Sequence, residues 1–259
     1  MISKSQKKYI SQLTNKKFRE KEGLFIAEGK KIIEEVLLSE IIVEHLYASE
    51  GFLQKHSGSI NSKRIKSTPI TDIELKIISC LKEPDDALAI CRIPEYDFTF
   101  SKNTSDLIIY IDDIRDPGNL GSIIRICDWF GVKKIICSPG TVDLYNPKTI
   151  QSTMGSFLRT NVFYMELEKL IEKQKILTGT EITIYGATME GTNIYRENEL
   201  HSGVIVIGNE ANGISPKNIN LIDRKICIPK TNSKGPESLN AAIATALILG
   251  EFRRRKMTN

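Results

Sequence analysis

Near-continuous apolar runs in the second half of the chain constrain the fold more than any other feature. They are LIIYID (107–112), KIICS (134–138), ITIYGAT (182–188), GVIVIG (203–208) and KICIP (225–229). Strands that are apolar on both sides are buried on both faces, as in a parallel sheet covered by helices. Segments with helical apolar spacing lie between or after them, at 120–131, 147–156, 167–176 and 238–255. This half is therefore predicted to be an α/β domain with a parallel sheet.

A shorter α/β pattern precedes that domain. GLFIAEG (23–29), EHLYAS (44–49) and ALAICRI (87–93) favour strands, and residues 30–39 and 72–79 have amphipathic helical spacing. Residues 94–105 are polar and lack periodicity, so they are predicted to be a linker. With 259 residues, the chain is about 1.7 times a typical domain of ~150 residues. We therefore expect two domains, 1–93 and 106–259.

The distribution of charge is more informative than the net charge of +4. Residues 1–31 contain nine Lys and Arg against three Glu, a local net charge of +6, and a second basic cluster occupies 253–256. Basic segments of this kind favour contact with nucleic acid, although a solvated helix face is the alternative interpretation of either cluster. Hydrophobic residues are 41% and charged residues 26% of the chain, which excludes a disordered or membrane-embedded protein.

The cysteines do not favour a metal site or a disulfide scaffold. The chain has five, none in a C-x-x-C pair, and only three histidines. Cys127, Cys137 and Cys227 lie in apolar runs, so we expect them to fill the core. The N-terminus has no signal-peptide core, and no run approaches the ~18 apolar residues of a membrane span. A reduced, cytoplasmic protein without membrane contact is the expectation.

Three loops at strand ends contain the candidate functional residues, because ligands of open parallel sheets bind beyond the carboxyl ends of the strands. In the first (112–121), Pro117-Gly118 indicates a turn and Asn119 is expected to cap the next helix. Arg125 follows within an apolar helix, where an arginine needs an anion, a carboxylate or the surface.

The second loop, 208–215, has two glycines that permit close backbone approach, but it matches neither a dinucleotide-binding motif nor a P-loop. In the third, Ser238 is expected to cap the last helix and Asn240 to lie inside it, beside small residues.

The combination of the three loops indicates a particular protein family more specifically than any one loop does. DDIRDPGNLGSIIRICDWFGV, VIVIGNEANGIS and CIP…ESLNAAIATALIL resemble motifs one to three of the SpoU (TrmH-like) RNA ribose 2′-O-methyltransferases of the SPOUT superfamily, in the same order and spacing. NKKFREKEGLFIAEGKKIIEEVL is similar to the N-terminal substrate-binding domain of that family, which has a ribosomal-protein-like fold. Motif three departs from the family pattern: its loop before Ser238 is longer, and Ala-Ala-Ile-Ala replaces a valine-rich continuation.

The resemblance implies a small α/β RNA-binding domain followed by a Rossmann-like parallel sheet with a deep C-terminal trefoil knot. It also implies a homodimer packed through the knotted domain and S-adenosylmethionine bound between motifs two and three, without a metal. The residues implied for the cofactor are Ala187, Thr188, Ile207, Gly208, Asn209, Ile228, Pro229 and Leu239. Those implied around the reacting hydroxyl are Asn119, Arg125, Glu210, Ser238 and Asn240.

Arg125 is often regarded as the base in this family, but a guanidinium stays protonated in proteins. We therefore expect Arg125 to act as a cation that binds the target phosphate and stabilises developing alkoxide. Lys16, Lys17 and Arg19 are expected to hold RNA, with Tyr9 and Phe18 nearby for stacking. Ribosomal RNA is favoured over transfer RNA. The alternatives are a transfer-RNA methyltransferase and a non-catalytic RNA-binding dimerisation protein, which would not bind S-adenosylmethionine.

Overall fold

The computed structural model describes residues 2–99, 107–197, 200, 202–232 and 234–258, with side chains described as far as residue 255. Its contacts divide the chain into a first unit, Met1–Tyr96 with Asp143–Leu158, and a second unit, Asp97–Val142 with Arg159–Asn259. Of the expected linker, residues 94–99 have no regular secondary structure, and 100–105 lie outside the described residues.

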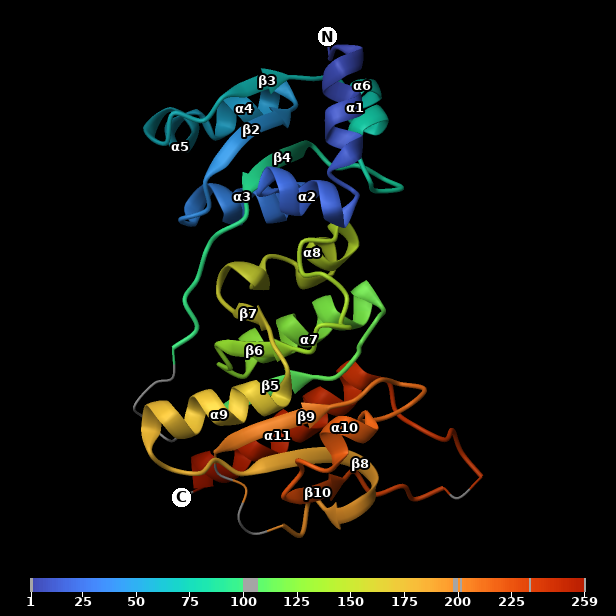
Figure 1. Ribbon diagram of the computed structural model, residues 1–259. Helices are drawn as coiled ribbons and strands as arrows, with labels where there is room; N and C mark the ends of the chain where they lie inside the picture. The colour runs from blue at the N-terminus through green and yellow to red at the C-terminus, as the bar shows by residue number, and fades with distance from the viewer. Residues whose placement is uncertain (1, 100–106, 198–199, 201, 233, 259) are drawn as a thin grey trace. The chain divides into compact units, whose positions relative to one another are not determined.

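The first unit is built on a mixed sheet with strand order β1-β4-β2-β3 (Figure 1). Its strands are β1 (Leu24–Glu28), β2 (Val43–Ala48), β3 (Ser67–Pro69) and β4 (Ala87–Arg92). β4 pairs antiparallel with β1 and β2, whereas β3 adds in parallel to β2. Its helices before residue 96 are α1 (Lys4–Gln12), α2 (Lys16–Glu22), α3 (Lys30–Leu38), α4 (Glu50–Lys55), α5 (Ser57–Ser62) and α6 (Asp72–Ile78).

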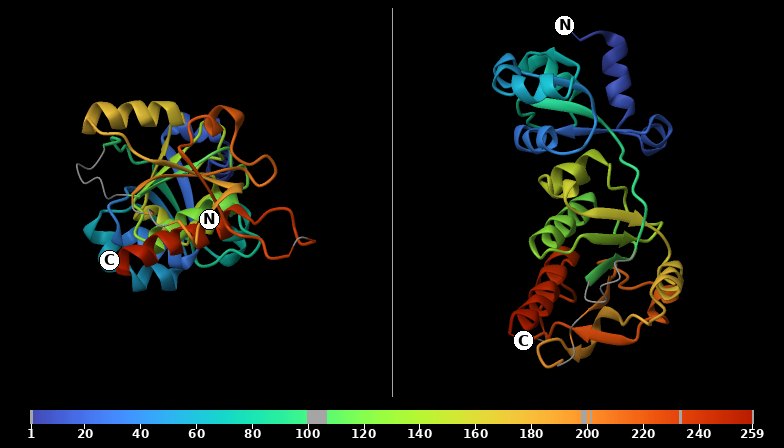
Figure 2. Two further views of the ribbon diagram at one scale, coloured as in Figure 1. Left: turned by 90° about the horizontal axis from the view of Figure 1, so that it is seen from below. Right: turned by 90° about the vertical axis from the view of Figure 1, so that its left-hand side faces the viewer.

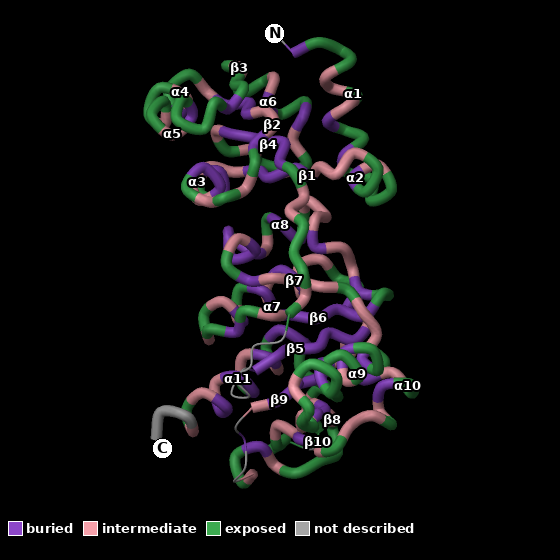
Figure 3. The backbone as a smooth tube through the Cα atoms, turned by 60° about the vertical axis from the view of Figure 1, so that its left-hand side comes forward, coloured by how far each residue is buried: buried purple, intermediate pink, exposed green. Residues whose placement is uncertain are grey.

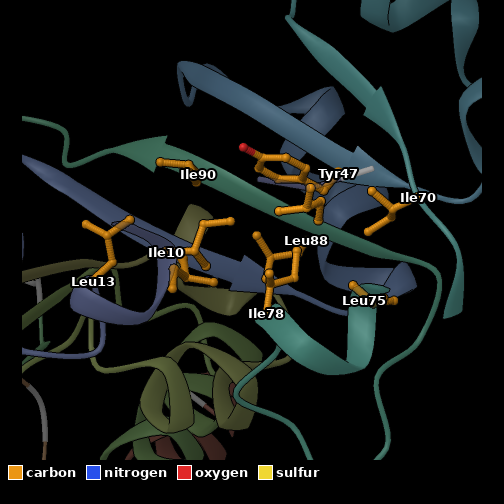
Figure 4. Close-up of a cluster of buried hydrophobic side chains, with 10 residues drawn as sticks. Ile10, Leu13, Tyr47, Ile70, Leu75, Ile78, Leu88 and Ile90 are labelled. Carbon is orange, nitrogen blue, oxygen red and sulfur yellow. The ribbon is translucent and has the colours of Figure 1, made fainter. Parts of the chain in front are cut away.

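An apolar cluster holds α1 and α6 against this sheet (Figure 4). Helix α1 begins with a capping box in which Ser3 and Gln6 satisfy each other's backbone N–H groups, which fixes the helix start. Ile10, on the buried side of the helix, and Leu13, at its C-terminal end, both point into the apolar cluster. These side chains pack in the same cluster as Tyr47 and Leu88 of the central strands, so the N-terminal segment is part of the core.

The segment Asp143–Leu158 comes from the middle of the chain yet clusters with the first unit. It contains α8 (Pro147–Thr153) and a 3-10 turn, Ser156–Leu158. The Phe25 ring of β1 lies 4.8 Å from the Tyr145 ring and 5.9 Å from the Phe157 ring, measured between centroids. The N-terminal sheet therefore shares its aromatic core with a segment more than a hundred residues away.

The second unit contains a sheet with strand order β10-β8-β9-β5-β6-β7, and every pair in it is parallel. The strands are β5 (Leu107–Ile111), β6 (Lys134–Cys137), β7 (Asn161–Tyr164), β8 (Ile184–Asn193), β9 (Gly203–Ile207) and β10 (Arg224–Cys227). This confirms the predicted parallel sheet. The sequence prediction missed β7, a short, half-buried edge strand without a continuous apolar run.

Helices cover both faces of this sheet (Figure 2). Helices α7 (Pro117–Trp129) and α11 (Ala241–Thr258) lie on one face, and α9 (Leu167–Thr178) and α10 (Pro216–Ile219) on the other. Side chains alternate along a strand, so Ile108 and Tyr110 join the cluster with α9 and α10, while Ile109 and Ile111 face the opposite layer. All five residues of β5 are buried (Figure 3).

Two helix starts differ from the sequence expectation. Asp116, not Asn119, caps α7, because its carboxylate accepts the Asn119 backbone N–H at 2.8 Å and Pro117 opens the helix. The last helix begins at Ala241, so Ser238 is not its cap. Asn240 is: its side-chain oxygen accepts the N–H groups of Ala242 and Ile243 at 3.0 and 3.3 Å.

The cysteine expectation is met at two of the three named positions. Cys127 and Cys137 are fully buried, whereas Cys227 is only half-buried and its thiol lies 3.2 Å from the Gly191 carbonyl oxygen. In the C-terminal basic cluster, Arg254 and Arg255 both bond to the Glu251 carboxylate, and the Lys256 side chain lies outside the described residues. No helix within the described residues is long and apolar enough to cross a membrane.

Candidate active site

A cavity of about 720 Å³ opens at the carboxyl ends of β9 and β10, beside the middle of β8, in the second unit. The middle of β8, the loops after β9 and β10, and the first turns of α11 form its wall. Every residue that the family resemblance implied for the cofactor lies on this wall: Ala187, Thr188, Ile207, Gly208, Asn209, Ile228, Pro229 and Leu239.

Small and branched apolar side chains shape the inner wall. Ile207, the last residue of β9, and Ile226, near the end of β10, lie on either side of β8 and are almost fully buried. Ala241 and Ala244, one turn apart on α11, also line the cavity. Because alanine carries a single methyl group, the helix leaves space where larger side chains would fill it. Ala241, Ala244 and Ile226 were not predicted as site residues, although the small residues that follow Asn240 were an available signal for the two alanines.

The loop after β9 folds tightly over its own start. A Cβ at residue 208 would overlap the backbone of Gly213 and Ile214, so only glycine fits there. Gly213 itself has φ +67°, in the left-handed region that favours glycine. The close backbone approach that was expected at Gly208 is therefore a contact with the backbone of its own loop. Asn209 completes the turn: its side chain donates to the Asp113 carbonyl at 2.8 Å and accepts the Ala211 N–H at 2.9 Å.

A buried carboxylate joins this loop to the first motif. Asp112, only 2% exposed, follows the last residue of β5 and accepts the Ser215 N–H at 2.8 Å. Its backbone N–H continues the β5–β9 ladder to Ile207. Asp112 was not predicted as a site residue, although its position directly after a buried strand was a signal that the sequence offered.

Four polar residues from all three motifs meet beside the cavity. The Asn119 amide donates to the Glu210 carboxylate. The Asn240 amide donates to the Asn119 side-chain oxygen at 2.8 Å, and the Ser238 hydroxyl lies 3.5 Å from the Glu210 carbonyl oxygen. We call these residues the Asn119 network. Glu210 and Ser238 also line the cavity, so the network and the cavity are continuous.

Arg125 does not belong to this network. It lies six residues after Asn119 on α7, about 240° around the helix axis and about 9 Å along it. Its side chain is exposed and has no hydrogen-bond or ion-pair partner among the described residues. Within one chain, Arg125 therefore does not line the cavity that Glu210 lines, and the expectation that these residues surround one hydroxyl stays a prediction.

The N-terminal residues expected to hold RNA separate into two groups. Lys16 and Lys17 are exposed on α2, and Lys16 has only a loose pair with Glu20 at 3.8 Å. Arg19 is 2% exposed; it pairs with Asp143 at 2.5 Å and donates to the Leu13 and Thr14 carbonyls. Arg19 therefore has a structural role within the first unit, and its expected contact with RNA stays a prediction.

The expected stacking side chains are also engaged within the first unit. Tyr9 and Phe18 pack edge to face, with centroids 5.6 Å apart, against the apolar cluster of α1 and α6. The Tyr9 hydroxyl donates to Glu22 at 3.0 Å. Burial and this acceptor raise the pKa of Tyr9. Neither ring is free to stack on a base as it stands.

The cavity fits a nucleoside-like cofactor. Its volume lies within the ~300–1,000 Å³ typical of small-molecule sites, and its wall is mainly apolar with backbone polar groups at strand ends. Among the described residues, no group of three or more His, Cys, Asp or Glu could hold a metal ion. The motif-three loop forms one wall, and within it Lys230 donates to the Gly235 carbonyl at 3.2 Å.

Comparison with known families gives two matches along the chain. The SpoU rRNA Methylase family model matches residues 106–250, which contain the cavity and the Asn119 network. The MRM3-like substrate binding domain matches residues 4–89.

Characterised relatives align over nearly the whole chain. The 23S rRNA (guanosine(2553)-2′-O)-methyltransferase RlmP of Bacillus subtilis is 27% identical over 253 residues, 97% of each chain. The 23S rRNA (uridine(2479)-2′-O)-methyltransferase of Streptomyces viridochromogenes is 26% identical and covers 95% of this chain and 88% of its own.

Solved structures agree on the fold. A TrmH-family protein from Porphyromonas gingivalis is 28% identical, with TM-score 0.82 over 98% of this chain and 99% of that one. The SpoU methyltransferase AviRb of Streptomyces viridochromogenes, solved with its cofactor AdoMet, has TM-score 0.87 at 23% identity, over 99% of this chain and 100% of that one.

Proposed function

Because the chain belongs to the SpoU rRNA methylase family, we propose that it transfers a methyl group from S-adenosylmethionine to a ribose 2′-hydroxyl of ribosomal RNA. The observation that carries this proposal is the continuity of the cofactor-sized cavity with the Asn119 network through Glu210 and Ser238. The named relatives act on 23S rRNA, which favours ribosomal over transfer RNA.

The cofactor would be held mainly by backbone groups and apolar contacts. Gly208 from the loop after β9, and Ile228 and Leu239 from the loop after β10, would offer main-chain donors and acceptors. Ala187 and Thr188 lie within the neighbouring strand β8. Ile226 and Ala244 would pack against its apolar surface. When bound, S-adenosylmethionine supplies a sulfonium methyl group that a ribose oxygen attacks directly, with S-adenosylhomocysteine leaving.

The protein then has to align the hydroxyl and accept or relay its proton. Asn119 holds the Glu210 carboxylate in place from α7, while Asn240 holds Asn119 from the start of α11. Such positioning can supply several kcal/mol of the roughly 7–11 kcal/mol that alignment offers. A correctly placed proton acceptor would add about 10²–10⁴ in rate. We propose that a phosphate oxygen or a water molecule accepts the proton.

Arg125 is proposed to bind an RNA phosphate and stabilise developing negative charge, as a permanently charged group can. Because it faces away from Glu210 of its own chain, we propose that it acts at a site completed by a second copy. Ile243 and Leu247, 54% and 41% exposed on α11, support a homodimer through this layer. We also propose the trefoil knot. It is supported by the course of the chain after β10, which brings the start of α11 beside Asn119.

The first unit is proposed to hold the RNA, with Lys16 and Lys17 as exposed phosphate contacts on α2. This assignment agrees with the match of residues 4–89 to a substrate-binding domain. As the bacterial relatives modify ribosomal RNA, we propose that the protein works in the cytoplasm.

Mapping ribose methylation across total RNA from cells with and without the protein tests the proposal. We expect one 2′-O-methyl group on ribosomal RNA to be lost, and restored by the wild-type gene but not by an Asn119→Ala variant. Loss of a methyl group from transfer RNA instead would favour the alternative substrate. Unchanged RNA, with no calorimetric binding of S-adenosylmethionine, would favour the non-catalytic RNA-binding protein.

A further inference from the structure

Trp129 is the only tryptophan in the chain, and 83% of its surface is exposed. It ends α7, on the layer that also contains α11 (Figure 1). The described residues of the cavity wall and the Asn119 network do not include it. A single exposed apolar side chain is common on protein surfaces. The case for a ligand contact at Trp129 therefore comes from the groups around it.

Trp129 lies on the same helix face as Arg125. Residues four apart on an α-helix are neighbours, about 5–6 Å between their Cβ atoms. Both side chains are exposed, so the indole and the guanidinium stand side by side on the outer face of α7. A planar aromatic ring beside a cation that has no partner among the described residues is complementary to a nucleotide. The base can stack on the ring, and the phosphate can pair with the cation.

The surroundings of Trp129 are cationic. From α11, Arg253 donates to the carbonyls of Phe130 and Gly131 at 2.7 and 3.3 Å, across the end of α7. Lys133 is exposed just beyond. The acid next to the ring, Asp128, is neutralised by Arg159, whose Nε lies 2.9 Å from its carboxylate. A positively charged rim around an aromatic ring is complementary to RNA.

We propose that Trp129 is a stacking platform for an unpaired base adjacent to the target ribose, with Arg125 on a neighbouring phosphate. The proposal rests on the proposed function and specifies its substrate: the ribose would lie in a single-stranded loop or bulge. A base inside an A-form duplex is already stacked on both faces and offers none to the indole.

A second copy of the chain, which we propose to pack near Arg125, fits the surface around Trp129 less well. Asn240 lies beside Asn119 and Arg253 beside Phe130, so α11 and α7 run in the same direction. The apolar residues of the proposed dimer, Ile243 and Leu247, thus accompany the first half of α7. Arg253 lies about 9 Å further along the helix. Two copies of the cationic rim would also repel each other.

Because Trp129 is the sole tryptophan, its fluorescence is a direct probe in the full chain. We expect a solvent-exposed emission maximum that is quenched by a single-stranded oligoadenylate RNA of about a dozen nucleotides and not by a blunt RNA duplex. Anisotropy with a labelled form of that RNA should give affinity about 5- to 150-fold weaker for Trp129→Ala. Trp129→Phe should recover part of the loss, and the slope of affinity against salt should stay unchanged.

Ile176→Ala is the matched control, because Ile176 is 80% exposed on α9 of the same unit. Its RNA affinity should equal that of the wild type. An RNA-insensitive, blue-shifted emission, with Trp129→Ala changing the monomer–dimer equilibrium in sedimentation, would overturn the proposal in favour of a protein contact. Failure of the proposed function would be seen separately, as wild-type protein that does not bind S-adenosylmethionine.

Discussion

The side-chain amide of Asn240 donates to the side-chain oxygen of Asn119 at 2.8 Å, although the two residues are 121 positions apart. Asn240 caps α11, and Asn119 lies in the first turn of α7 and also donates to Glu210. One amide thus connects the starts of two helices to the loop after β9. Alignment of the candidate active site depends on this pair.

Replacing Asn119 with alanine should lower methyl transfer on the order of 10²-fold, because Glu210 and Asn240 both lose their shared partner. The affinity for S-adenosylhomocysteine should change less than about threefold, since the described residues that line the cavity do not include Asn119. Single-turnover methylation and calorimetry measure the two effects. Ser122→Ala, one turn along α7, is the control. Equal losses of affinity and turnover would contradict the positioning role.

Gly208→Ala should abolish cofactor binding, because the added methyl group overlaps the backbone of Gly213 and Ile214 and must displace the loop. Gly58→Ala serves as the control, as nothing lies within 4 Å of a Cβ there. Calorimetric titration with S-adenosylhomocysteine measures the loss, and circular dichroism checks that the fold persists. Normal binding by Gly208→Ala would mean that the loop adapts without cost.

Arg19 and Lys17, neighbours on α2, should respond in opposite ways. Arg19→Met leaves Asp143 without its partner and should cost about 3–5 kcal/mol in urea unfolding, with most of it recovered in Arg19→Met/Asp143→Leu. Lys17→Met should change stability by less than about 0.5 kcal/mol. Lys17→Met should instead weaken RNA binding and reduce the slope of log affinity against log salt concentration by about 1. A stable Arg19→Met that loses RNA would support the original expectation for Arg19.

Deleting residues 1–100 should remove RNA binding but leave the affinity for S-adenosylhomocysteine within about threefold, because every described residue of the cavity belongs to the second unit. The deletion also uncovers Tyr145 and Phe157, which pack on Phe25 in the full chain. We therefore expect a lower melting temperature as well. In the full chain, Phe25→Ala should lose about 3–5 kcal/mol. Loss of cofactor binding on deletion would refute the division of labour.

Stability should depend on pH through Glu251. Hydrogen bonds from Arg254 and Arg255 lower its pKa from 4.5 to about 2. A carboxyl whose pKa is depressed in the folded state adds stability above its unfolded pKa and loses it as the pH falls. We expect this contribution to disappear between pH 4.5 and about 2. Glu251→Gln should flatten the unfolding curve there and cost on the order of 1–3 kcal/mol at pH 7. Glu20→Gln, on an exposed helix face, should do neither.

The sequence determined the central strands of the second domain and most of the cavity. The buried runs at 107–112 and 203–208 predict parallel strands because burial on both faces requires apolar residues throughout. The loops after such strands converge at one sheet edge. The residues implied by the family motifs, from Ala187 to Leu239, accordingly lie around a single cavity.

Only the tertiary structure decided which side chains face one another. Local patterns do not show that Asp143 lies beside Arg19, so Arg19 was predicted to hold RNA together with Lys16 and Lys17. Nor do they show that α11 starts beside Asn119, while Arg125 and Trp129 remain on the outer face of α7. Hydrophobic periodicity is set by near neighbours in the chain, whereas burial and pairing depend on segments that meet only after folding.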